Sequence, residues 1–249
     1  GGAPDMAAVG DAQLRKAMVE LAALDAVLLV HTEDACELGT PTLMAEHRPP
    51  RAERRGLERV IAAARLAGTR THVNSFTAAE CAALLSAASS VGVRLTAQTC
   101  AHYLCLPAET ARPETHGCRP PLRSEANRRA LWSAFLARGE SSITTIGSGH
   151  LPAHNVYTLE WGLSALWTAA SRRRLGLAEL SRWTSTAPAS LVGLGGKGRI
   201  AEGYDADLVA FAPESTVVIP AADPSPYAGG SLTGRVERVW VSGRERPLG

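Results

Sequence analysis

The sequence predicts an α/β protein with a parallel sheet, followed by a small β-rich segment. Strands and amphipathic helices alternate through the first two-thirds of the chain, which is typical of parallel βα units. A continuous apolar run at residues 26–30 predicts a buried strand. From residue 195 onward, short alternating segments separated by turn residues replace this pattern.

The predicted helices and strands follow one another in pairs. Apolar residues at helical spacing predict a helix over 11–24, which precedes the strand at 26–30. The later helices are predicted at 52–67, 78–90 and 124–137, and the strands that follow them at 69–74, 94–98 and 142–146. This makes about four βα units, whereas an α/β barrel closes with eight strands. We therefore expect either an open sheet edge that another protein segment completes, or a fold that is not a barrel.

The C-terminal part is predicted to form a small β-module. Its segments are expected at 198–201, 208–212, 216–219 and 236–241. We therefore divide the chain into an α/β part at residues 1–194 and a β-rich part at residues 195–249.

Length and charge exclude several classes of protein. With 249 residues and 45% hydrophobic content, the chain can bury the core of one globular domain. The formal net charge is +2 and the arginines are scattered, so we expect no basic face for nucleic acid or for a membrane surface. No apolar run reaches transmembrane length.

Cysteine usage and the first residues bear on the setting of the protein. The five cysteines are odd in number and form no CxxC pair, which predicts neither a disulfide framework nor a zinc ribbon. We therefore expect a reducing, cytoplasmic location. The chain opens at Gly1-Gly2 without a methionine, as expected of a processed product or a fragment.

Polar residues directly after the predicted strands are the candidates for chemistry, because active sites of parallel α/β proteins lie at the carboxyl ends of strands. They are His31 to Asp34, His72 with Asn74 and Ser75, Gln98 to His102, and Ser148 to His150. Histidine suits metal binding or proton transfer, although a single strand-end histidine is more often a structural residue. A metal site that combines His31, His72, His150 and His154 is one alternative. His47 and His116 are expected in solvated loops.

Several segments, in order along the chain, resemble motifs of one enzyme family. Residues 28–34 (LLVHTED) are similar to LLVHAED, residues 98–104 (QTCAHYL) to ETCPHYL, residues 120–123 to PPLR, residues 148–152 (SGHLP) to SDHSP, and residues 197–209 to KGRIA.GYDADLV. These are motifs of the cyclic amidohydrolases, which include allantoinases, dihydropyrimidinases and dihydroorotases. Residues 224–229 (PSPYAG) resemble the allantoinase segment NPVTPYAG, which favours allantoinases within the family.

The resemblance implies a (β/α)8 TIM-type barrel with a β-sandwich built from both termini. Two divalent metal ions, usually zinc, are bridged in the family by a carbamylated lysine. This chain would supply about the last four βα units, so a partial barrel followed by a β-sandwich segment is expected. The family's His-x-His pair and its lysine have no counterpart in the sequence.

The resemblance also implies a role for individual residues. His31 matches a metal ligand, whereas Ser75 and Gly149 occupy two further ligand positions, and the residue that Gly149 replaces is the catalytic aspartate. Cys118, Pro120 and His150 would face the substrate. A hydrolytic metal needs about three or more protein ligands, so we expect zinc not to be bound properly by this chain.

Three hypotheses follow from these observations. The first is an allantoinase-like hydrolase that opens the ring of allantoin in purine catabolism, with a small cyclic ureide as its ligand, but inactive as this chain stands. The second is a catalytically dead homologue that serves as a binding or structural subunit, and the third is a partial or decayed sequence without function. A dihydropyrimidinase or dihydroorotase activity is the alternative within the enzyme class. Exposed strand edges predict a homo-oligomer or an aggregation-prone chain.

Overall fold

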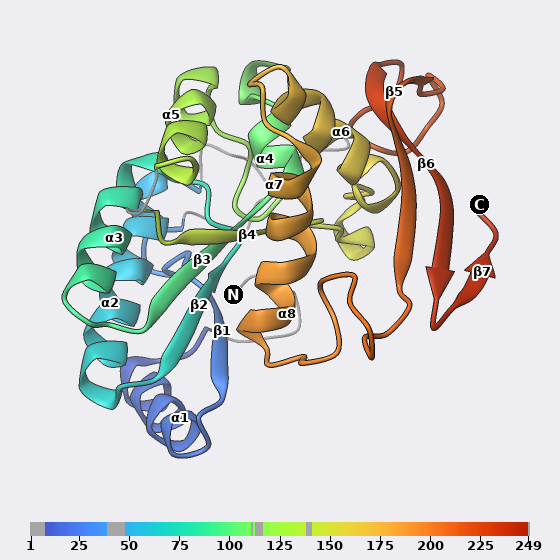
Figure 1. The fold of residues 1–249 in the computed structure, drawn as a ribbon. Helices are drawn as coiled ribbons and strands as arrows, with labels where there is room; N and C mark the ends of the chain where they lie inside the picture. Colours follow the sequence, from blue (N-terminus) through green and yellow to red (C-terminus); the bar gives the residue numbers. More distant parts are fainter. Residues whose placement is uncertain (1–7, 39–47, 111, 113–116, 138–140, 249) are drawn as a thin grey trace. The chain divides into compact units, whose positions relative to one another are not determined.

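A computed structural model of the chain describes residues 8–38, 48–110, 112, 117–137 and 141–248 (Figure 1). The backbone packs into two compact units, Gly1–Val156 and Tyr157–Gly249, and each is described by itself. His47 and His116 lie outside the described residues.

The first unit contains a four-stranded sheet in the order β1-β2-β3-β4. Its strands are β1 (Val27–His31), β2 (Arg70–Asn74), β3 (Leu95–Cys100) and β4 (Ile143–Gly147). Every neighbouring pair is parallel. The predicted α/β fold with a parallel sheet is therefore confirmed, and the carboxyl ends of all four strands meet at one edge.

Helices connect these strands. They are α1 (Asp11–Ala23), α2 (Pro50–Ala67), α3 (Ala82–Ser90), α4 (Ala101–Cys105) and α5 (Glu125–Phe135), with single 3-10 turns η2 (Ala79–Cys81), η3 (Ala108–Thr110) and η5 (Pro152–His154). Helix α2 begins with a proline in its first turn and ends at Gly68, whose φ of 69° is the left-handed conformation that glycine adopts without strain. Helix α5 begins after Ser124, whose hydroxyl accepts a hydrogen bond from the Asn127 backbone.

The core of this unit forms between the sheet and its helices. Figure 1 shows α2 and α3 beside the strands. Leu57 of α2, Val73 of β2 and Leu85 of α3 are fully buried. Each such side chain contributes roughly 1.5–3 kcal/mol by leaving water. In contrast, Leu29 on the edge strand β1 is 50% exposed, so the expected open edge is present among the described residues.

The second unit combines helices with an antiparallel sheet. Its elements are α6 (Leu159–Ser171), α7 (Leu177–Ser181), the π-helical segment η6 (Arg182–Thr186), α8 (Ala187–Leu191), β5 (Leu208–Val218), β6 (Ser231–Val241) and β7 (Arg244–Arg246). The sheet order is β5-β6-β7. The predicted β-rich segment in the C-terminal part of the chain is therefore observed. The predicted division at residue 194 differs from the break in packing after Val156. It stays a prediction about which residues belong to the partial barrel and which to the β-sandwich segment.

Two details of the C-terminal prediction were wrong. Residues 198–201 form no strand, because Gly198 has a φ of 90° and its backbone lies against Ala189 and Ser185, where a Cβ would not fit. The segments predicted at 208–212 and 216–219 belong to one strand, β5, which has a register shift between Ala212 and Thr216. No helix among the described residues is both long and apolar enough to cross a membrane.

Candidate active site

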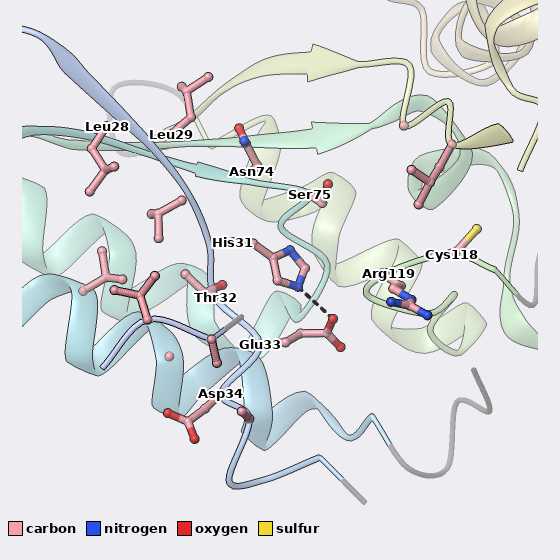
Figure 2. A pocket seen from close by; sticks show the side chains of 18 of the residues that line it. Leu28, Leu29, His31, Thr32, Glu33, Asp34, Asn74, Ser75, Cys118 and Arg119 are labelled. Atoms are coloured by element: carbon pink, nitrogen blue, oxygen red, sulfur yellow. Dashed lines mark hydrogen bonds and ion pairs between the residues drawn. The ribbon is translucent and has the colours of Figure 1, made fainter. Parts of the chain in front are cut away.

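A cavity of about 540 Å³ opens at the carboxyl ends of the strands in the first unit (Figure 2). Most of its polar lining comes from the ends of the four strands and from the loops that follow them, and Arg59 of α2 adds to it. These residues are His31, Thr32, Glu33, Asp34, Arg59, Asn74, Ser75, His102, Tyr103, Arg119 and His150, and Cys118 and Gly149 line the same space. The structure thus brings His31, Ser75, Cys118, Gly149 and His150 together. Pro120 is not part of the lining, and its carbonyl accepts a hydrogen bond from the Tyr103 hydroxyl at 2.6 Å.

At the end of β1, His31 is oriented by a buried carboxylate. His31 Nε2 lies 2.9 Å from Glu33 Oε2, and Arg48 binds both oxygens of the same carboxylate. Burial alone would raise the pKa of Glu33, but the hydrogen bonds from His31 and Arg48 outweigh it and lower the pKa. An ionised Glu33 accepts the proton of Nε2–H, which leaves Nδ1 of His31 as the acceptor nitrogen. The end of β1 therefore offers one imidazole with a fixed tautomer (Figure 2).

At the end of β2, Ser75 provides only a hydroxyl. His31 and Asn74 are neighbours in the parallel register, and Ser75 follows Asn74 directly. Ser75 has a φ of 57°, so the chain turns sharply away from the strand at this residue. Cys100 Sγ lies 4.0 Å from the Ser75 hydroxyl oxygen. Unlike histidine, serine brings no imidazole nitrogen to this position.

At the end of β4, Gly149 leaves no room for a side chain. It has a φ of 62°, and a Cβ built on it would lie 2.2 Å from His102 Cε1 and 3.1 Å from Cys100 Sγ. His102 is 1% exposed and its ring packs 4.0 Å from that of Tyr103. Burial lowers the pKa of His102 to about 4, so its ring is neutral at pH 7. A neutral imidazole therefore lies where a side chain at position 149 would begin, and its ring would have to shift to admit one.

His72 does not belong to the cavity. Its Nδ1 lies 2.7 Å from Thr96 Oγ1 on β3 and its Nε2 lies 3.1 Å from Thr145 Oγ1 on β4, so both ring nitrogens have partners within the sheet. Burial lowers the pKa of His72 to about 4. The structural interpretation of this histidine is therefore the correct one, and the alternative metal site that includes it is not assembled.

The described residues do not fit the two-metal centre that the family resemblance implies. Within these ranges, no three side chains of histidine, cysteine, aspartate or glutamate are grouped so that they could hold a metal ion. His31 brings one nitrogen, while serine and glycine at positions 75 and 149 bring no imidazole or carboxylate. No reaction step through a metal is derived from this part of the chain.

Arg123 of the PPLR segment has a structural role that the sequence alone did not reveal. Its guanidinium donates to Glu53 Oε1 at 2.7 Å and to the Arg48 carbonyl oxygen at 2.7 Å. Glu53 is 1% exposed and also accepts hydrogen bonds from the backbone of Thr77 and Ala78. This buried pair connects α2 to the loop after β2 and so supports the base of the cavity.

The parallel sheet, with helices between its strands and a cavity at the strand ends, is that of an α/β protein. The model of the amidohydrolase family matches residues 4–246. The chain is 34% identical to the allantoinase of Streptomyces avermitilis, over 93% of this chain and 58% of that protein. It is 30% identical to the allantoinase of Salmonella newport, over 96% of this chain and 60% of that protein. The chain therefore belongs to the amidohydrolase family.

Solved structures agree with this assignment. The L-hydantoinase (dihydropyrimidinase) from Arthrobacter aurescens matches with a TM-score of 0.87 at 25% identity, over 98% of this chain and 62% of that one. The dihydropyrimidinase from Brevibacillus agri matches with a TM-score of 0.83 at 26% identity, over 97% of this chain and 61% of that one. The chain spans about three-fifths of the length of these relatives.

Proposed function

We propose that this chain is an allantoinase-related cyclic amidohydrolase that binds a small cyclic ureide at its strand ends but does not hydrolyse it as the chain stands. In this proposal β1 to β4 correspond to the last four strands of a (β/α)8 barrel, and the antiparallel sheet to part of a β-sandwich. Support comes from the family match, from the two allantoinases that resemble most of the chain, and from the cavity at the expected end of the sheet.

The observation that carries the proposal is the contact between Gly149 and His102. Hydrolysis of a cyclic amide needs an activated water and a base that moves its proton. In the family resemblance the base is an aspartate at position 149. In this structure the His102 ring lies 2.2 Å from where a Cβ at position 149 would stand, and glycine itself brings no carboxylate. The cavity can still enclose a ring between apolar and hydrogen-bonding side chains.

An active hydrolase of the dihydropyrimidinase or dihydroorotase type is the second candidate. It is favoured by the contact of 2.9 Å between His31 Nε2 and Glu33, because metal-binding histidines commonly carry a carboxylate on their distal nitrogen. The similarity to two dihydropyrimidinase structures supports it as well. In that case the remaining ligands lie outside the described residues.

The experiment that decides between these functions uses the purified, dialysed full chain. Its metal content, its ring-opening activity on allantoin with added zinc, and its binding of allantoin by calorimetry are measured on one preparation. We expect less than one metal ion per chain, no turnover above the uncatalysed rate, and saturable binding of allantoin. About two bound ions with turnover would establish the hydrolase. Absence of allantoin binding would overturn the proposed ligand.

A further inference from the structure

One cation of the cavity has no counter-charge among the described residues. Arg119 lines the cavity, and its Nε atom is buried without a hydrogen-bond partner. Figure 2 shows Arg119 beside Cys118, on the opposite side of the cavity from Leu28 and Leu29. No carboxylate within the ranges that the structure describes forms an ion pair with it. Arg119 is half-buried, and a buried N–H without a partner is unfavourable, so its Nε atom points to a ligand.

The two carboxylates of the cavity are already engaged. Glu33 binds His31 and Arg48, and Asp34 binds Arg59. Burial and the nearby Arg48 guanidinium lower the pKa of Arg119, while the charge of Glu33 acts in the opposite direction. An arginine nevertheless stays charged at neutral pH. Within the part of the chain that the structure describes, the side of the cavity next to Arg119 therefore has no carboxylate that is not already engaged.

The neighbouring loop adds no anion. Burial lowers the pKa of His154, and the positive charge of Arg119 lowers it further. The Nδ1 atom of His154 is also buried without a hydrogen-bond partner among the described residues. His154 does not line the cavity, so Arg119 is the group that a ligand there can reach.

We propose that Arg119 binds the carboxylate of a ring-opened ureido acid, so that the cavity prefers this acyclic anion to the neutral ring. When a hydantoin ring is hydrolysed, water adds to the carbonyl carbon and the C–N bond breaks. The nitrogen takes a proton and the carbon becomes a carboxylate, which is the charged group that the ring lacks. The planar guanidinium fork matches a carboxylate through two parallel hydrogen bonds. The inference rests on the proposed function, because it assigns a ligand class to the same cavity.

Calorimetric titration of the full chain with three probes tests this inference. The probes are hydantoin, its ring-opened product N-carbamoylglycine, and the neutral amide of N-carbamoylglycine. We expect N-carbamoylglycine to bind about 10- to 100-fold more tightly than either neutral probe, as a charge-assisted hydrogen-bonded pair does. Arg119→Gln should abolish this preference. Arg119→Lys should keep part of it, because lysine is a point charge without the fork.

Arg65→Gln is the matched control, because Arg65 is an exposed arginine of α2 outside the cavity lining. Equal affinity of the wild-type chain for the acid and its neutral amide would overturn the inference without any variant, so a folding defect of Arg119→Gln cannot hide the answer. A preference that persists in Arg119→Gln would overturn it too. If the chain binds hydantoin without preferring the acid, the inference is overturned and the proposed function is not. Binding of the acid through Arg119 without hydantoin binding supports the inference and overturns ring binding.

Discussion

The imidazole of His102 occupies the space that a side chain at Gly149 would need, with only 2.2 Å between His102 Cε1 and the position of a Cβ. Both residues stand at strand ends, since α4 begins directly after β3 and Gly149 follows β4 by two residues. The present position of the His102 ring and a side chain at position 149 therefore exclude each other unless the ring shifts.

Gly149→Asp should destabilise the chain and should not restore hydrolysis. The left-handed φ and the contact with His102 together are expected to lower the free energy of unfolding by roughly 2–5 kcal/mol. Urea denaturation measures this loss. Gly92→Asp is the control, because Gly92 has a φ of 89° with no atom within 4 Å of a Cβ, so it reports the backbone strain alone. The double variant Gly149→Asp with His102→Ala should recover part of the loss, and equal losses for both glycines would contradict the packing argument.

Glu53→Ala should be strongly destabilising. It removes the partner of the Arg123 guanidinium and the acceptor of two backbone amides, which leaves a buried charge unpaired. A loss of about 3–5 kcal/mol is expected. Glu58→Ala on the same helix breaks an exposed pair with Arg54 and should change stability by less than about 0.5 kcal/mol. Similar denaturation midpoints for the two variants would show that the buried network contributes little.

The carboxylate of Glu33 should make stability depend on pH in the acidic range. Its pKa in the folded chain lies below its ordinary value of 4.5, so its contribution is complete above pH 4.5 and is lost as pH falls through the lowered pKa. Glu33→Gln should flatten this part of the profile of unfolding free energy against pH. Glu37→Gln, at an exposed carboxylate paired with Arg51 and Arg55, should flatten it less. An unchanged acid limb in Glu33→Gln would contradict the prediction.

His72 should act in a higher pH window. Its pKa falls from 6.5 to about 4 on folding, so the unfolded chain takes up the proton first. Stability is therefore complete above pH 6.5 and declines as pH falls toward 4. His72→Gln should remove part of this decline, while His102, with a pKa of about 4, retains its own part. Chemical denaturation between these pH values tests the prediction, and a profile parallel to wild type would contradict it.

The sequence predicted the parallel sheet well because apolar spacing reports directly on burial. The helix over 11–24 and the strand over 69–74 agree closely with α1 and β2. The strand at 198–201 was wrong because its local pattern does not show that Ile200 is 89% exposed. Strand β7 was missed because the segment Arg244–Arg246 contains no apolar residue.

The site was less predictable because its properties depend on contacts between distant residues. The structural role of His72 depends on Thr96 and Thr145, which sequence inspection cannot pair with it. Whether Arg119 has an ion-pair partner depends on Glu33, whose carboxylate is already bound by Arg48. The identities of Ser75 and Gly149 were visible in the sequence, whereas the lack of space at Gly149 was not.

The packing of His102 against Gly149 also has an evolutionary consequence. A side chain that returns at position 149 in this chain would meet the ring of His102, so the ring has to shift before an acid can be accommodated. The motifs ETCPHYL and SDHSP combine this histidine with an aspartate, so the shift requires no substitution at position 102. Regaining the acid therefore depends on the freedom of one ring to move, and not on the order of two substitutions.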